Sequence, residues 1–207
     1  MRALPRSSAE RPAAVLILFG VLDAHASRHE VQDAAVARDL DVLLLARAAT
    51  LRSHPGQIAF PGGRLDAGDD GPVAAALREA EEETGLDPSG IDVLGPLPSV
   101  PLEHSGHLVT PVLGWWRRPS PVRVVDLAES ADVFRAPVAD LLDPARRGVS
   151  LLRRGGRQLR GPAFLVSRPD GPDHLVWGFT GILLDALFDR LGWTEQWDRD
   201  RVIGVLG

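Results

Sequence analysis

The stretch REAEEETGL at residues 78–86 concentrates four glutamates in five positions of this 207-residue chain. Residues three and four apart on an α-helix lie on one face, so Glu79, Glu82 and Glu83 converge while Glu81 points elsewhere. Carboxylates at that spacing repel one another, and a hard divalent cation such as Mg²⁺ would relieve the repulsion and bridge to substrate phosphates. A solvated acidic helix face is the alternative interpretation. The run therefore indicates a candidate metal site.

The residues before the acidic run predict the helix that carries it. Apolar residues recur at helical spacing over residues 73–80, and Pro72 suits a first helical turn. We expect Asp69 or Asp70 to cap the start of this helix and Gly85 to end it.

Two neighbouring features suit phosphate chemistry. The stretch 47–71 reads as a long functional loop with two glycine clusters, and its Gly62-Gly63 pair lets backbone N–H groups approach a phosphate or carboxylate closely. Arg78 is expected to orient one of the carboxylates through a bidentate pair. These neighbours favour the metal site over a merely solvated helix face.

The pattern from Gly63 to Leu86 resembles the Nudix box, a glycine and an acidic residue followed by Arg-Glu-x-x-Glu-Glu-x-Gly-apolar. Its second half matches in full from Arg78 onward. In the first half, counting back from Arg78, Asp70 stands where the family usually has glutamate. The stretch from Gly63 to Asp70 is one residue longer than usual. Asp69 has the usual spacing from Gly63 but not to Arg78, which indicates a one-residue insertion in the loop.

This resemblance implies a fold and a cofactor. The fold is of the α+β class, a Nudix α/β/α sandwich with a mixed β-sheet and a loop–helix–loop catalytic box. The cofactor is Mg²⁺ or Mn²⁺, held by Glu79, Glu82 and Glu83, with Arg78 as a further catalytic-site residue.

A second motif narrows the resemblance to the coenzyme A pyrophosphatase branch of Nudix hydrolases. It comprises LLLARA at residues 43–48 and RSHPGQIAFPGG at residues 52–63, and WGFTG at residues 177–181 resembles the same branch. The branch often has threonine at the position of Leu45. The resemblance implies substrate-binding roles for these residues: Arg47, Arg52, His54, Gln57, Gly62 and Gly63. A structural salt bridge or loop hydrogen bond is the alternative for each.

The implied reaction is hydrolysis of the phosphoanhydride of coenzyme A or its thioesters, which yields 3′,5′-ADP and free or acylated phosphopantetheine. The water's proton would go to one of the three glutamates or to Glu103. Two alternatives stay open: a pyrophosphatase for another dinucleotide such as NADH or ADP-ribose, and a nucleotide-binding regulator without catalysis. The intact set of three glutamates argues against the regulator.

Composition limits the other classes of function. Hydrophobic residues make up 44% of the chain, the net charge is −5 and cysteine is absent. The acidic balance disfavours sequence-independent nucleic-acid binding, and the lack of cysteine excludes disulfides and thiolate metal sites. We expect a loose tail at residues 1–12 and a single domain at 13–207. We also expect a cytoplasmic protein, not a membrane protein, that acts alone or as a homodimer on a small nucleotide.

We expect residues 14–19 to form the first core strand. An N-terminal signal peptide is the alternative interpretation of this apolar stretch. A basic cluster at residues 153–160 reads as a solvated hairpin, with an anion site as the alternative. The remaining expected strands are 41–46, 94–97, 108–116, 122–125, 158–166 and 174–177, and the remaining expected helices are 136–142 and 180–191.

Overall fold

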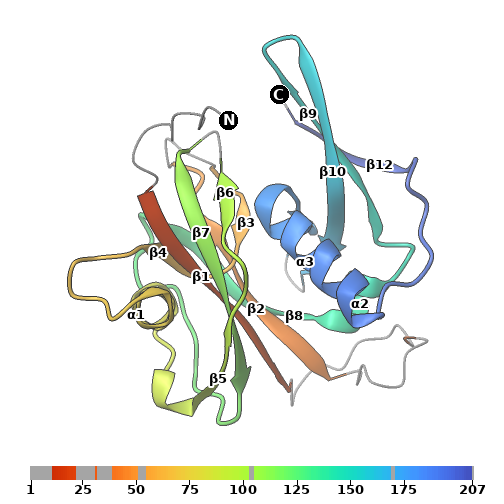
Figure 1. Cartoon of the computed structure of the whole chain (residues 1–207). Coiled ribbons are helices and arrows are strands. Elements are labelled where there is room, and N and C mark those ends of the chain that lie inside the picture. The colour runs from red at the N-terminus through yellow and green to blue at the C-terminus, as the bar shows by residue number, and fades with distance from the viewer. Residues whose placement is uncertain are drawn as a thin grey trace, which may run out of the picture. The chain divides into compact units, whose positions relative to one another are not determined.

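The computed structural model describes residues 11–21, 31, 39–50, 55–102, 105–168 and 171–206. The chain divides into two compact units, and Figure 1 labels most of their elements. The first unit comprises Met1–Phe19 and Phe60–Val125, and the second comprises Gly20–Ala59 and Asp126–Gly207. Whether residues 13–207 act as a single domain stays a prediction.

The first unit contains a mixed β-sheet. β1 (Arg11–Val21) pairs in parallel with β7 (His107–Trp116) and antiparallel with β4 (Gly62–Arg64). β7 also pairs antiparallel with β5 (Ile91–Pro96) and β6 (Val100–Leu102). Mixed pairing together with helices confirms the expected α+β class.

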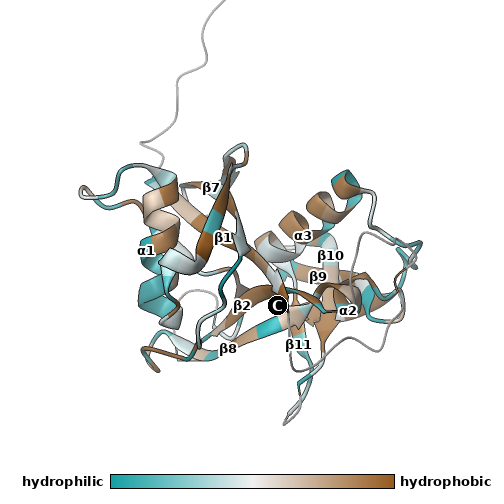
Figure 2. Cartoon of the chain, turned by 90° about the horizontal axis from the view of Figure 1, so that it is seen from below, coloured by the Kyte–Doolittle hydropathy of each residue, from teal (hydrophilic) through white to brown (hydrophobic). Residues whose placement is uncertain are grey.

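Burial explains why β1 forms at the centre of this sheet. Leu16, Ile17 and Leu18 are fully buried, as expected for a continuous apolar run that is covered on both faces. Figure 2 shows this run of hydrophobic residues along β1. The strand begins at Arg11, so residues 11 and 12 belong to the sheet and not to the predicted tail.

α1 (Pro72–Thr84) carries the acidic run and buries small residues, among them Ala76 and Ala80. Its C-terminal end is as predicted: Gly85 adopts a left-handed conformation with φ 69°, and its N–H donates to the Glu81 carbonyl. The predicted N-terminal cap is wrong. Gly71 occupies the cap position without any side-chain hydrogen bond, because Asp69 directs its carboxylate to Arg78 instead. A short 3₁₀ helix, η1 (Pro88–Gly90), follows.

The second unit contains the strand that precedes the loop predicted at residues 47–71. β2 (Leu40–Arg47) pairs antiparallel with the two-residue strand β3 (Ile58–Ala59) and with β8 (Ser130–Pro137). The short helix α2 (Val138–Leu142) continues from β8 and buries four of its five residues.

A four-stranded sheet completes the second unit. Its strand order is β11 (His174–Val176), β10 (Arg157–Val166), β9 (Arg147–Arg154) and β12 (Val202–Leu206). β9 and β10 form the hairpin expected at residues 153–160. α3 (Gly178–Leu191) packs on β10, where Phe188 meets Phe164 edge to face.

Most predicted elements agree with the structure within a few residues, with two exceptions: one predicted strand is absent, and residues 47–71, predicted to be a loop, contain the short strands β3 and β4. Residues 122–125 form no strand, because the Arg123 N–H donates to the carbonyl of Thr84 at the end of α1. The helix expected at residues 136–142 begins only at Val138, since Ala136 and Pro137 end β8. Among the residues that the structure describes, no helix is long and apolar enough to cross a membrane.

The end of α1 provides a stability test. Gly85→Ala should lower the free energy of unfolding by about 1 kcal/mol, because an alanine is strained in the left-handed region. The substitution creates no collision, since the added Cβ would lie 3.5 Å from the nearest side-chain atom. Gly68→Ala is the control: its Cβ would meet nothing within 4 Å and its φ lies outside that region. Urea titration of both variants measures the difference, and equal stabilities would contradict the assigned role of Gly85.

Candidate active site

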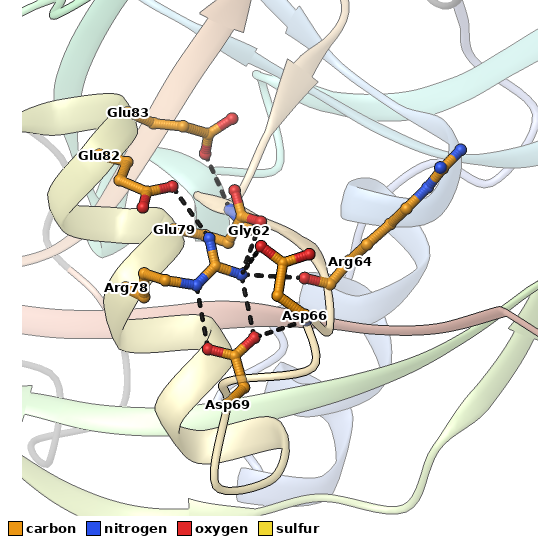
Figure 3. Close-up of polar contacts among 8 residues, drawn as sticks. All are labelled: Gly62, Arg64, Asp66, Asp69, Arg78, Glu79, Glu82 and Glu83. Carbon is orange, nitrogen blue, oxygen red and sulfur yellow. Dashed lines mark hydrogen bonds and ion pairs between the residues drawn. The ribbon is translucent and has the colours of Figure 1, made fainter.

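The acidic run lies in the first unit, on α1, and faces the loop that joins β4 to this helix. Figure 3 shows the side chains of Glu79, Glu82 and Glu83 leaving α1 toward that loop. The three glutamates therefore lie on one face of α1, as the helical spacing predicts. The structure shows in addition what holds each carboxylate.

Arg78 is at the centre of this cluster. Its Nε and Nη2 donate to the two carboxylate oxygens of Asp69, each at 3.0 Å. Its Nη1 donates to Glu82 at 2.9 Å, and Nη2 also reaches Glu79 at 3.1 Å. A further contact of 3.1 Å goes to the backbone carbonyl of Arg64, whose side chain points away in Figure 3. One guanidinium thus joins the loop to two of the three glutamates.

The bidentate partner of Arg78 is Asp69, not a glutamate of the helix. These hydrogen bonds hold the pKa of Asp69 below its ordinary value, since they favour the charged carboxylate. Asp69 also accepts a 2.7 Å hydrogen bond from the Asp66 N–H, which closes the loop on itself. The neighbouring Asp70 is exposed. Sequence spacing did not decide between Asp69 and Asp70. In the structure it is Asp69 that contacts Arg78.

Gly63 leaves the space that the Glu79 carboxylate occupies. A Cβ at Gly63 would lie 2.4 Å from Oε1 of Glu79, closer than atoms can approach. Burial raises the pKa of Glu79 above its ordinary value, and the adjacent Arg78 opposes this shift. A side chain at position 63 would therefore displace Glu79.

Glu83 is held by the other glycine of the pair. The Gly62 N–H donates to Oε2 of Glu83 at 2.9 Å. Gly62 must itself be a glycine, because its φ is 154° and a Cβ would lie 2.3 Å from the Ala14 carbonyl oxygen on β1. In this structure the glycine pair positions the glutamates, and the substrate contacts expected of Gly62 and Gly63 stay predictions.

The donor set suits a hard divalent cation. The three glutamates offer only carboxylate oxygens, the ligands that Mg²⁺ and Mn²⁺ favour, and the lack of a side chain at Gly63 admits the carboxylate of Glu79. Within the described part of the chain, no group of three acidic or histidine side chains is already arranged to hold a metal ion. Arg78 and the Gly62 N–H occupy these carboxylates instead. The Glu82 side chain is 59% exposed and has the most freedom to turn toward a cation.

The other predicted site residues lie apart from this cluster in the sequence. Arg47 ends β2 and Gln57 directly precedes β3, both in the second unit. The Arg47 N–H donates to the Gln57 carbonyl at 3.0 Å, so the two ends of this loop are joined. Arg52, His54 and Glu103 lie outside the described residues.

Sequence reasoning missed two contributors to the cluster, the carboxylate of Asp66 and the carbonyl of Arg64. Asp66 lies 3.8 Å from Nη2 of Arg78. A backbone carbonyl leaves no trace in a sequence pattern. The sequence contains acidic residues at positions 66, 69 and 70, but their spacing alone does not show which of them contacts Arg78.

A family model for the NUDIX domain matches residues 28–144. A protein named uncharacterized Nudix hydrolase NudL from Photorhabdus laumondii is 39% identical over 151 residues, which are 72% of this chain and 76% of that protein. A protein of the same name from Escherichia coli K12 is 38% identical over 152 residues, covering 73% and 75% of the two chains. A MutT/nudix family protein from Enterococcus faecalis shares the fold, with a TM-score of 0.50, 19% identity, and coverage of 92% of this chain and 65% of that one.

Asp69 and Asp70 form a matched pair for testing how the carboxylates are organised. Asp69→Asn should lower the affinity for Mn²⁺ about tenfold, because it weakens the fork that holds Arg78 among the glutamates. Asp70→Asn removes the same charge one residue away and should change the affinity less than about twofold. Calorimetric titration with Mn²⁺ compares the two. Equal losses would show that only the local charge matters, not the contact with Arg78.

Proposed function

The chain belongs to the Nudix hydrolase family, and from this premise we propose that it hydrolyses the phosphoanhydride bond of coenzyme A or its thioesters. The products are 3′,5′-ADP and phosphopantetheine, free or acylated. The observation that carries the reaction class is the cluster on α1, where Glu79, Glu82 and Glu83 are all present and face one loop.

The three glutamates would hold Mg²⁺ or Mn²⁺. When bound, such a cation lowers the pKa of a coordinated water and neutralises charge that develops on phosphate oxygens. The chain's own contribution is orientation: Arg78 fixes Glu79 and Glu82, while the Gly62 N–H fixes Glu83. One of these glutamates or Glu103 accepts the proton of the attacking water.

The choice of substrate rests on the loop between β2 and β3. Coenzyme A carries a diphosphate and a separate 3′-phosphate, which arginine forks recognise well. Nε of Arg47 is buried and lacks a hydrogen-bond partner among the described residues. Buried donors are normally paired, so this atom supports a ligand contact at Arg47. Arg52, His54 and Gln57 complete the proposed set on the basis of the resemblance.

NADH or ADP-ribose is the rival substrate within the same reaction class. A regulator that only binds a nucleotide does not require three clustered carboxylates, and the cluster on α1 is intact. We therefore favour an enzyme.

The glutamates provide the test of the reaction class. Glu82→Gln and Glu83→Gln should each lower kcat at least about a hundredfold, since loss of a metal carboxylate removes roughly 3 kcal/mol of transition-state stabilisation. Glu81→Gln is the matched control, because Glu81 is exposed on the same helix. Turnover at saturating Mg²⁺, and its loss with EDTA, are measured for all three. Near-normal rates for Glu82→Gln and Glu83→Gln, or hydrolysis after complete chelation, would refute the assignment.

Substrate choice has its own test, since dephospho-coenzyme A lacks only the 3′-phosphate. The wild type should prefer coenzyme A about tenfold to a hundredfold in kcat/KM, and Arg47→Ala or Arg52→Ala should shrink the preference, because a charge-assisted hydrogen bond contributes roughly 1.5–3 kcal/mol. Arg117→Ala, which removes an exposed arginine paired with Asp92, is the control. If the ratio of kcat/KM for the two substrates is unchanged in both loop variants, these arginines contact the diphosphate or stabilise the loop itself. Equal rates on the two substrates for the wild type would remove the 3′-phosphate contact.

A further inference from the structure

The WGFTG segment at residues 177–181 forms the start of α3 and contacts the end of the loop that resembles the coenzyme A signature. The Thr180 hydroxyl donates to the carbonyl oxygen of Ile58 at 3.0 Å. Both residues are buried, Thr180 with 4% and Ile58 with 1% of its surface exposed. This contact joins two motifs that lie 122 residues apart in the chain.

The pairing of β3 explains why Ile58 needs a donor from α3. β3 has only two residues, and it pairs with β2 through Ala46 opposite Ile58. The Arg47 N–H donates to the carbonyl of Gln57. Successive carbonyls of a strand point to opposite edges, so the carbonyl of Ile58 faces away from β2. The Thr180 hydroxyl therefore donates the hydrogen bond that the Ile58 carbonyl accepts at the edge of β3 that faces away from β2.

Gly178 leaves the space for the side chain of Gln57. A Cβ at Gly178 would lie 2.6 Å from Nε2 of Gln57, and the φ of Gly178 is +63°. A substitution at this position therefore moves the Gln57 amide as well as straining the backbone. Gln57 is one of the residues for which the resemblance implies a substrate-binding role.

α3 is itself fixed to the sheet of the second unit. A Cβ at Gly181 would lie 2.8 Å from the Pro162 carbonyl oxygen, so the helix approaches β10 closely at its first turn. Further along, Leu184 and Phe188 are fully buried, and Phe188 packs against Phe164 of β10. The first turn of α3 is thus a rigid support for the Gln57–Ile58 segment.

We propose that Thr180 and Gly178 are positioning residues that set the conformation of Gln57 and Ile58, and through it the affinity for the nucleotide substrate. This inference rests on the proposed function in one respect, the placement of Gln57 and Arg47 at the substrate. The two residues act on binding and not on the metal-dependent step, because their contacts are to the loop that ends at β3.

Thr180→Val removes the donor at nearly constant volume, and Thr180→Ser restores it. Thr180→Val should raise KM about tenfold with kcat unchanged within about twofold, and should speed hydrogen exchange in a peptide covering residues 55–60. Thr180→Ser should restore both values. Ser150→Ala is the matched control, since it removes a hydroxyl-to-carbonyl contact with Gly161 elsewhere in the second unit. Kinetics are measured with Mg²⁺ on coenzyme A, NADH and ADP-ribose.

A double-mutant cycle keeps the proposal testable if Thr180→Val does not fold. Gly178→Ala should also raise KM, and should raise it much less in a Gln57→Ala background, because the displaced amide is then absent. Additive effects of Gly178→Ala and Gln57→Ala would overturn the role of Gly178.

The outcomes separate this inference from the substrate assignment. Normal KM in Thr180→Val on coenzyme A, or a fall in kcat alone, overturns the inference and leaves the proposed function standing. Turnover of NADH or ADP-ribose but not coenzyme A overturns the substrate assignment, and the change in KM on that nucleotide then decides the inference. No turnover of any of the three overturns both.

Discussion

The guanidinium of Arg78 is the interaction on which the rest of the candidate site depends. Its nitrogens lie within 4 Å of carboxylates from Asp66, Asp69, Glu79 and Glu82. Without a positive charge among them, these groups would repel one another and the loop before α1 would open. Because the guanidinium is planar and offers five donors in a fixed fork, it sets the directions of its partners as well as neutralising them.

The glycine pair imposes the second constraint, and this one is steric. Gly62 brings β4 against β1, and Gly63 admits the carboxylate of Glu79. The same pair that joins the sheet thereby determines where two glutamates can lie. A site of this kind tolerates no side chain at these two positions, although neither glycine has a side chain that takes part in the chemistry.

Local patterns predicted α1 and the face that carries its glutamates, because helical periodicity and the glycine stop depend on neighbouring residues alone. The role of Asp69 could not be predicted, since counting along a loop does not show where an insertion is accommodated. Residues 122–125 have strand-like composition, but the Arg123 N–H donates to the Thr84 carbonyl at the end of α1 and these residues form no strand. The support that Thr180 gives to Ile58 depends on a tertiary contact that no local signal reports.

We propose that the site on α1 cleaves the phosphoanhydride bond of coenzyme A. The most direct measurement is incubation of the protein with coenzyme A, NADH and ADP-ribose in Mg²⁺, with the products resolved by chromatography. We expect 3′,5′-ADP and phosphopantetheine from coenzyme A, formed faster than AMP from either of the other nucleotides. Coenzyme A recovered intact while NADH or ADP-ribose is cleaved would contradict this proposal.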